Sequence, residues 1–144
     1  MSDILGEKVR LYGYDLKIES NSDGKTTLLV ALYWQCLQPM QHSYTVFVHL
    51  LDVDERIVAQ ADALPLGGRF GTLFWQPGDQ LRGEYRLDLP DSKTQGPLSL
   101  RVGMYIPASN ERLALTDSGS TADSVAIGPF WLQAEHVVFE EQVH

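Results

Sequence analysis

A long connection between two strand-like segments carries the side chains best suited to ligand chemistry. Residues 64–79 hold three aromatic residues but no sustained alternation of apolar and polar side chains. Aromatic faces stack on the apolar faces of sugar rings, and a loop can present them where a strand would bury them. Polar side chains in and beside this connection could contact sugar hydroxyls. The candidate ligand-binding residues are Trp75, Phe74, Phe70, Arg69, Asp62 and Asp79, with Gln76 as a further polar group.

The same aromatic residues have a structural interpretation, which we favour. A long connection that crosses a sandwich of sheets usually folds its aromatics down as plugs over the open end of the core. The two interpretations make opposite predictions for Trp75→Ala. A sugar-stacking Trp75 predicts lost glycan retention at a nearly unchanged melting temperature, whereas a plug predicts a large drop in stability.

Metal chemistry has little support in the sequence. The acidic turn Asp52-Val53-Asp54-Glu55 offers the oxygen ligands that calcium prefers, but three side chains in a hairpin do not make a site. The twelve-residue calcium pattern is absent, and acidic residues at a hairpin tip favour the turn itself. The histidines at positions 42, 49, 136 and 144 lack the close spacing of a zinc pair. We therefore expect no metal and no cofactor.

Catalytic motifs are not legible in the sequence, which shows neither a nucleophile elbow nor a phosphate-binding loop. Gly67-Gly68 lacks the following helix and the lysine of such a loop, and it favours a backbone turn. His49 lies within an apolar strand, where we expect it to pack beside Phe47 rather than act as a base. Cys36 should be buried and inert. We expect a protein that is not an enzyme; a hydrolase whose site is invisible in the sequence is an alternative.

Alternation of apolar and polar residues predicts the strands that must position these groups. The first strand changes phase at Gly13, which indicates a bulge. The turn at 52–56 is too short for a crossover helix and predicts an antiparallel hairpin. Gly128-Pro129 interrupts the last apolar segment, and this proline should lie at an edge or a bulge. The expected strands are 9–19, 26–35, 44–51, 57–63, 80–89, 98–106, 111–115 and 124–133.

These strands predict an all-β fold, because turn signals recur every eight to twelve residues and no amphipathic helix is long enough to cover a sheet. We expect an antiparallel two-sheet sandwich of eight to nine strands, immunoglobulin-like or jelly-roll. Residues 1–144 should form one domain with its core at about 9–133. The tail, 134–144, fits either a strand extension or a short helix.

Composition narrows the classes of partner. The 144 residues carry a net charge of −8, from 19 acidic and 11 basic side chains, and 44% of them are hydrophobic. The electrostatic field of this negative net charge repels phosphate backbones, so nucleic acid is not an expected partner. No apolar run approaches the roughly 20 residues that span a bilayer, and the N-terminus lacks a signal-peptide pattern, which predicts a soluble chain without membrane insertion. The single cysteine excludes an internal disulfide and leaves the compartment open.

Ordered aromatic and glycine landmarks give the chain a resemblance over about residues 9–132. They are Leu11-Tyr12-Gly13-Tyr14-Asp15-Leu16, Leu32-Tyr33-Trp34-Gln35, Tyr44-Thr45-Val46-Phe47-Val48-His49-Leu50-Leu51-Asp52, Val58-Ala59-Gln60-Ala61-Asp62, Pro65-Leu66-Gly67-Gly68-Arg69, Trp75-Gln76-Pro77-Gly78-Asp79 and Leu100-Arg101-Val102-Gly103-Met104-Tyr105. With these landmarks the chain resembles the soluble C-terminal β-sandwich domain of some bacterial membrane glycosyltransferases of the dolichyl-phosphate-mannose mannosyltransferase type. The sequence shows no such membrane segment, so we expect either an excised piece or a free-standing relative.

The resemblance implies an accessory or recognition module near cell-envelope glycan metabolism, with a glycan as its partner. A protein-interaction or structural sandwich without a small-molecule ligand is the alternative. Such a sandwich would form a homodimer through an edge strand or bind another protein. A glycan array tests the first function, and light scattering for a dimer tests the second.

Overall fold

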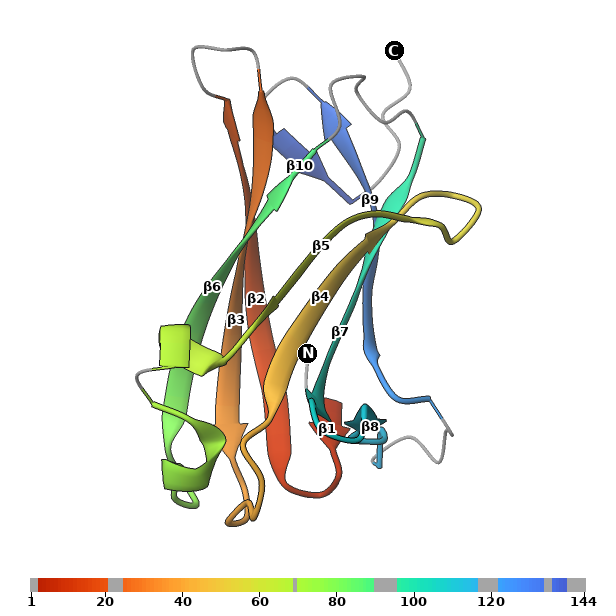
Figure 1. Cartoon of the computed structure of the whole chain (residues 1–144). Coiled ribbons are helices and arrows are strands. Elements are labelled where there is room, and N and C mark those ends of the chain that lie inside the picture. Colours follow the sequence, from red (N-terminus) through yellow and green to blue (C-terminus); the bar gives the residue numbers. More distant parts are fainter. Residues whose placement is uncertain are drawn as a thin grey trace.

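The computed structural model describes residues 3–20, 25–68, 70–89, 96–116, 122–133 and 136–139. They form two antiparallel β-sheets that pack face to face (Figure 1). The expected all-β class and two-sheet arrangement are therefore confirmed. Within these residues there is no helix of the length and apolarity needed to cross a membrane.

One sheet has four strands in the order β1-β2-β3-β6. β3 is apolar on both faces and lies inside the sheet, paired with β2 on one side and β6 on the other. The register between β2 and β3 shifts between Leu11 and Gly13, which confirms the bulge expected from the change of phase. The strands of this sheet are β1 (Asp3–Leu5), β2 (Val9–Ser20), β3 (Thr26–Cys36) and β6 (Gln80–Asp88).

The second sheet has the order β10-β9-β7-β4-β5, with β8 paired to β7. β4 and β5 form the expected antiparallel hairpin. Pro129 lies within β9, next to a register shift between Leu98 and Leu100 of β7, which agrees with the bulge expected at this proline. The strands of this sheet are β4 (Thr45–Leu51), β5 (Ile57–Ala63), β7 (Leu98–Ile106), β8 (Glu111–Arg112), β9 (Val125–Gln133) and β10 (His136–Val138).

The described residues form ten strands, where eight to nine were expected. β1 is the addition, since three residues are too few to show alternation. The strand expected at 111–115 is shorter, because β8 ends at Arg112 and Leu115 makes only an isolated bridge with Leu5. In the tail, His136–Val138 forms a strand, which agrees with the expected strand extension rather than the short helix. Residues 134–135 and 140–144 lie outside the described part.

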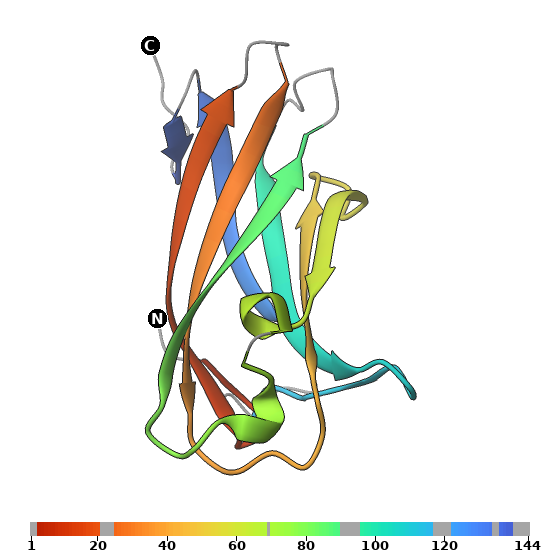
Figure 2. The same ribbon diagram turned by 60° about the vertical axis from the view of Figure 1, so that its left-hand side comes forward.

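The long connection forms two short 3₁₀ helices, η1 (Pro65–Gly68) and η2 (Thr72–Phe74). They take the chain from β5 in one sheet to β6 in the other. β5 and β6 are edge strands of their sheets, and the two short helices lie along that side of the sandwich (Figure 2). The connection is therefore a wall between two sheet edges.

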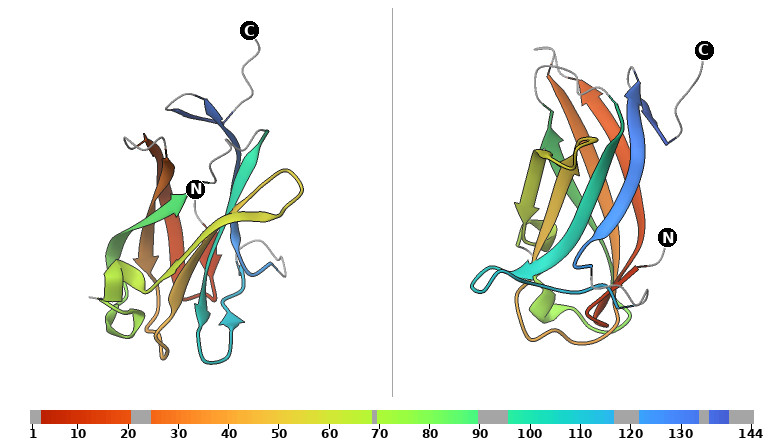
Figure 3. Two further views of the ribbon diagram at one scale, coloured as in Figure 1. Left: turned by 45° about the horizontal axis from the view of Figure 1, so that its top comes forward. Right: turned by 90° about the vertical axis from the view of Figure 1, so that its right-hand side faces the viewer.

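The core lies between the sheets and is filled by the inward faces of both. In β4, for example, Val46, Val48 and Leu50 point into the core, as the alternation predicts. Figure 3 shows the two layers from further directions, with the β4–β5 hairpin extending away from the four-stranded sheet. The largest fully buried side chains of this core include Trp34, Phe130, Leu28, Leu32, Leu50, Leu87, Leu100 and Met104.

Candidate functional site

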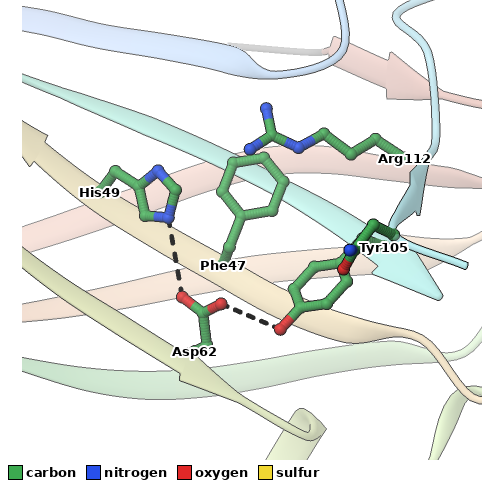
Figure 4. Close-up of a pocket in the computed structure, with 6 residues that line it drawn as sticks. Phe47, His49, Asp62, Tyr105 and Arg112 are labelled. Carbon is green, nitrogen blue, oxygen red and sulfur yellow. Dashed lines mark hydrogen bonds and ion pairs between the residues drawn. The ribbon is translucent and has the colours of Figure 1, made fainter. Parts of the chain in front are cut away.

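The outward face of β4, β5 and β7 carries a pocket of about 320 Å³ (Figure 4). Three adjacent strands bring its residues together, because β4 pairs with β5 on one side and with β7 on the other. Phe47 of β4 stands opposite Asp62 of β5 and opposite Gly103 of β7. The pocket is lined by Phe47, His49, Asp62, Tyr105, Asn110 and Arg112.

Phe47 forms the floor of this pocket. It points away from the core, yet it is only 1% exposed. Gly103 makes this possible, because a Cβ at that position would lie 2.6 Å from the Phe47 ring. Arg112 covers the ring from above, with its guanidinium carbon 4.3 Å from the ring centroid. The ring is thus held between the backbone of β7 at Gly103 and the stacked Arg112 guanidinium.

Asp62 is the polar centre of the pocket. The Tyr105 hydroxyl donates a hydrogen bond of 2.9 Å to its Oδ2. The His49 Nε2 lies 3.7 Å from Oδ1, which is an ion-pair distance but too long for a direct hydrogen bond. In Figure 4 both side chains converge on the carboxylate from β4 and β7. In the described part of the chain, Oδ1 therefore has no donor within hydrogen-bond distance and can accept one from a ligand.

The surroundings shift the titration of the two groups that face Asp62. Burial lowers the pKa of His49, and Arg112 lowers it further, while Asp62 acts in the opposite direction. Burial raises the pKa of Tyr105, and the hydrogen bond to Asp62 adds to this effect. At neutral pH His49 is therefore mainly an uncharged imidazole, and Tyr105 is a phenol that donates.

Arg112 is a structural cation of the site. Its Nη1 lies 3.2 Å from the Asp123 Oδ1, so its charge is compensated outside the pocket. The pair holds the guanidinium over Phe47. Exposed ion pairs contribute only about 0–1 kcal/mol to stability, so the contact is better regarded as positioning than as a major source of stability.

The pocket offers hydrogen-bond donors and acceptors to a ligand. A His-Asp pair can activate the hydroxyl or thiol of a serine, threonine or cysteine that lies within reach of the imidazole. Among the residues that line this pocket there is no such side chain. In the described part of the chain, no three histidine, cysteine or acidic side chains come together in a way that could hold a metal ion.

The aromatic residues predicted from the connection do not share one face. Trp75 is only 2% exposed and belongs to the core, and its indole Nε1 donates to the Phe70 carbonyl at 2.9 Å. Phe70 is partly buried against that core. Phe74 is 69% exposed and points away from it. Trp75 is therefore placed as a plug, and of the three aromatics only Phe74 presents most of its side chain to solvent.

The predicted polar residues are also separated. The Asp79 carboxylate accepts the Gln76 backbone N–H at 2.9 Å and so closes a turn. Arg69 lies outside the described residues. Of the predicted site residues that the structure describes, only Asp62 lines the pocket. The acidic turn is explained locally, since the Asp52 carboxylate accepts backbone N–H groups of Asp54 and Arg56.

Sequence reasoning missed Phe47, Tyr105, Asn110 and Arg112 as site residues, and it expected His49 only to pack beside Phe47. One signal could have found Tyr105. It occupies the outward parity of its strand, as Phe47 and His49 do in theirs, and antiparallel pairing of β4 and β7 brings the three together. Asn110 and Arg112 enter from the turn and strand after β7, whose path the alternation did not define.

No protein-family model matches this chain, and no curated protein sequence shows significant similarity to it. The function is therefore argued from the pocket itself, since a sandwich of sheets hosts many activities.

Proposed function

We propose that this chain is a non-catalytic carbohydrate-recognition module associated with cell-envelope glycan metabolism. The observation that carries the proposal is the Asp62 carboxylate, which has one oxygen held by Tyr105 and the other open in the pocket. The resemblance to the C-terminal domain of bacterial membrane glycosyltransferases supports the biological setting.

The donors and acceptors of the pocket match those of a sugar. A carboxylate only accepts, an amide such as Asn110 both donates and accepts, and a neutral imidazole does the same. A sugar ring presents several hydroxyls that need both kinds of partner. The volume of about 320 Å³ lies at the lower end of the range for ligand pockets, about 300–1,000 Å³, and suits a short glycan segment.

A glycan array followed by calorimetry with its best ligand tests the proposal. Asp62→Asn should weaken binding about tenfold or more, because a hydrogen bond to a charged group is worth roughly 1.5–3 kcal/mol. Tyr105→Phe should also weaken binding, because it removes the donor that positions the Asp62 carboxylate. Asp54→Asn is the matched control, since it removes the same charge from the exposed turn of the same hairpin without touching the pocket. Binding that survives both pocket substitutions, or an array without any retained glycan, would refute the proposal.

The strand order supports a finer proposal for the fold. β2-β3-β6 in one sheet and β5-β4-β7-β9 in the other follow the immunoglobulin-like order with an added strand beside the third one. We therefore propose an immunoglobulin-like sandwich rather than a jelly roll.

Self-association is the second candidate function. Phe74 and Leu73 are 69% and 52% exposed in η2, beside the strands that end each sheet. Exposed apolar side chains next to strand edges favour pairing with another chain. Sedimentation of the parent and of Phe74→Ser tests this function: a dimer that dissociates in the variant supports it, and a monomeric parent excludes it.

A further inference from the structure

The charges of the pocket do not balance. Two of its lining residues have charged side chains, Asp62 and Arg112. Arg112 is paired with Asp123 at 3.2 Å. Among the described residues, no lysine or arginine lies within ion-pair distance of Asp62, whose nearest basic neighbour is His49 at 3.7 Å. With Asp62 and Asp123 counted against Arg112, the site has a net charge of −1.

A sugar ring cannot stack on Phe47 at the floor of the pocket. The outer face of Phe47 is already covered by the Arg112 guanidinium, at 4.3 Å from the ring centroid. Specificity therefore depends on what meets the open oxygen of Asp62. A charged donor makes a hydrogen bond roughly twice as strong as a neutral one does, so a cation gains more at this position than a hydroxyl.

We propose that the preferred ligand is a glycan with a free amino group, an amino sugar whose nitrogen is not acetylated. This inference rests on the proposed carbohydrate binding. The ammonium would donate to Asp62, and the neighbouring ring hydroxyls would meet Tyr105 and Asn110. The net charge of −8 on the whole chain adds a field that attracts such a ligand and repels uronic acids.

Calorimetry with three oligosaccharides of equal length tests the preference: glucosamine, N-acetylglucosamine and glucose oligomers. The glucosamine oligomer should bind at least tenfold more tightly than the other two. Asp62→Asn should abolish this difference while thermal unfolding shows an intact fold. Asp54→Asn removes the same formal charge elsewhere and should leave the difference unchanged.

The outcomes separate this inference from the proposed function. Equal binding of all three oligomers would overturn the amino-sugar preference and leave carbohydrate binding standing. No binding of any oligomer, together with an empty glycan array, would remove both. An equal loss in Asp62→Asn and Asp54→Asn would show that overall charge rather than the pocket attracts the cation. A lysine-rich peptide that binds as tightly as the glucosamine oligomer would also overturn the assignment to a sugar.

Discussion

Truncation of Trp75 should destabilise the protein strongly. The indole belongs to the core, is 2% exposed and donates its N–H to the Phe70 carbonyl at 2.9 Å. Replacing a buried large aromatic with alanine costs about 3–5 kcal/mol. In a domain of this size 1 kcal/mol shifts the melting temperature by about 2–4 °C, so we expect Trp75→Ala to lower it by roughly 6–20 °C.

The adjacent residue provides the matched control. Phe74 is 69% exposed, and Phe74→Ala should change the free energy of unfolding by no more than about 0.5 kcal/mol. Urea unfolding followed by far-UV circular dichroism measures both variants without depending on tryptophan fluorescence. Trp75→Phe is a milder change that should cost roughly 1–3 kcal/mol, because it leaves the Phe70 carbonyl without its donor. Its free energy of unfolding tests the same contact if Trp75→Ala does not fold. Equal stability of Trp75→Ala and Phe74→Ala would refute the plug.

Three further changes test the pocket and the connection by urea unfolding. Gly103→Ala should cost about 1–3 kcal/mol, because its Cβ would lie 2.6 Å from the Phe47 ring. Gly13→Ala, with its nearest neighbour at 3.5 Å, is the control. A Phe47→Leu background should reduce the penalty to what the Asp123 carbonyl oxygen at 3.1 Å imposes, and an undiminished penalty would contradict the cause. Thr72→Val should cost roughly 1–3 kcal/mol, since the buried hydroxyl bonds two backbone groups of the β3–β4 connection; unchanged stability would show that these groups find other partners. His49→Gln should reduce the loss of stability on acidification. Burial lowers the pKa of His49 in the folded protein below the unfolded value of about 6.5. The unfolded chain therefore binds more protons than the folded one, and the parent protein loses stability as the pH falls through that value. Identical pH dependence of the two proteins would count against this account.

The strands could be predicted because one face of each must be buried. Alternation places β4, β5, β6 and β7 almost at their observed bounds, and the change of phase at Gly13 locates the bulge in β2. β1 could not be predicted, since three residues do not establish a period. It forms because Leu5 is buried in the core and the strand adds to the edge of β2.

The site could be predicted only in part, because its residues come from four strands and a turn. Asp62 was selected for its closeness in sequence to the aromatic connection, yet its partners in space are Tyr105 and His49. Those contacts depend on the pairing of β4 with both β5 and β7, which a single sequence does not define. The burial of Trp75 likewise cannot be read from a single sequence, because it depends on η1 and η2 connecting the edge strands β5 and β6 of the two sheets.

The position of the pocket separates binding from folding. Successive side chains of a strand point to opposite faces, so Val48 fills the core while His49 beside it lines the pocket. Asp62 and Tyr105 stand on that outward face, and removing their hydrogen bond does not open the core. Loss of glycan binding in Asp62→Asn at unchanged stability would therefore report on recognition itself. A variant of Trp75 cannot give that information, because any change in binding would be inseparable from the cavity it leaves.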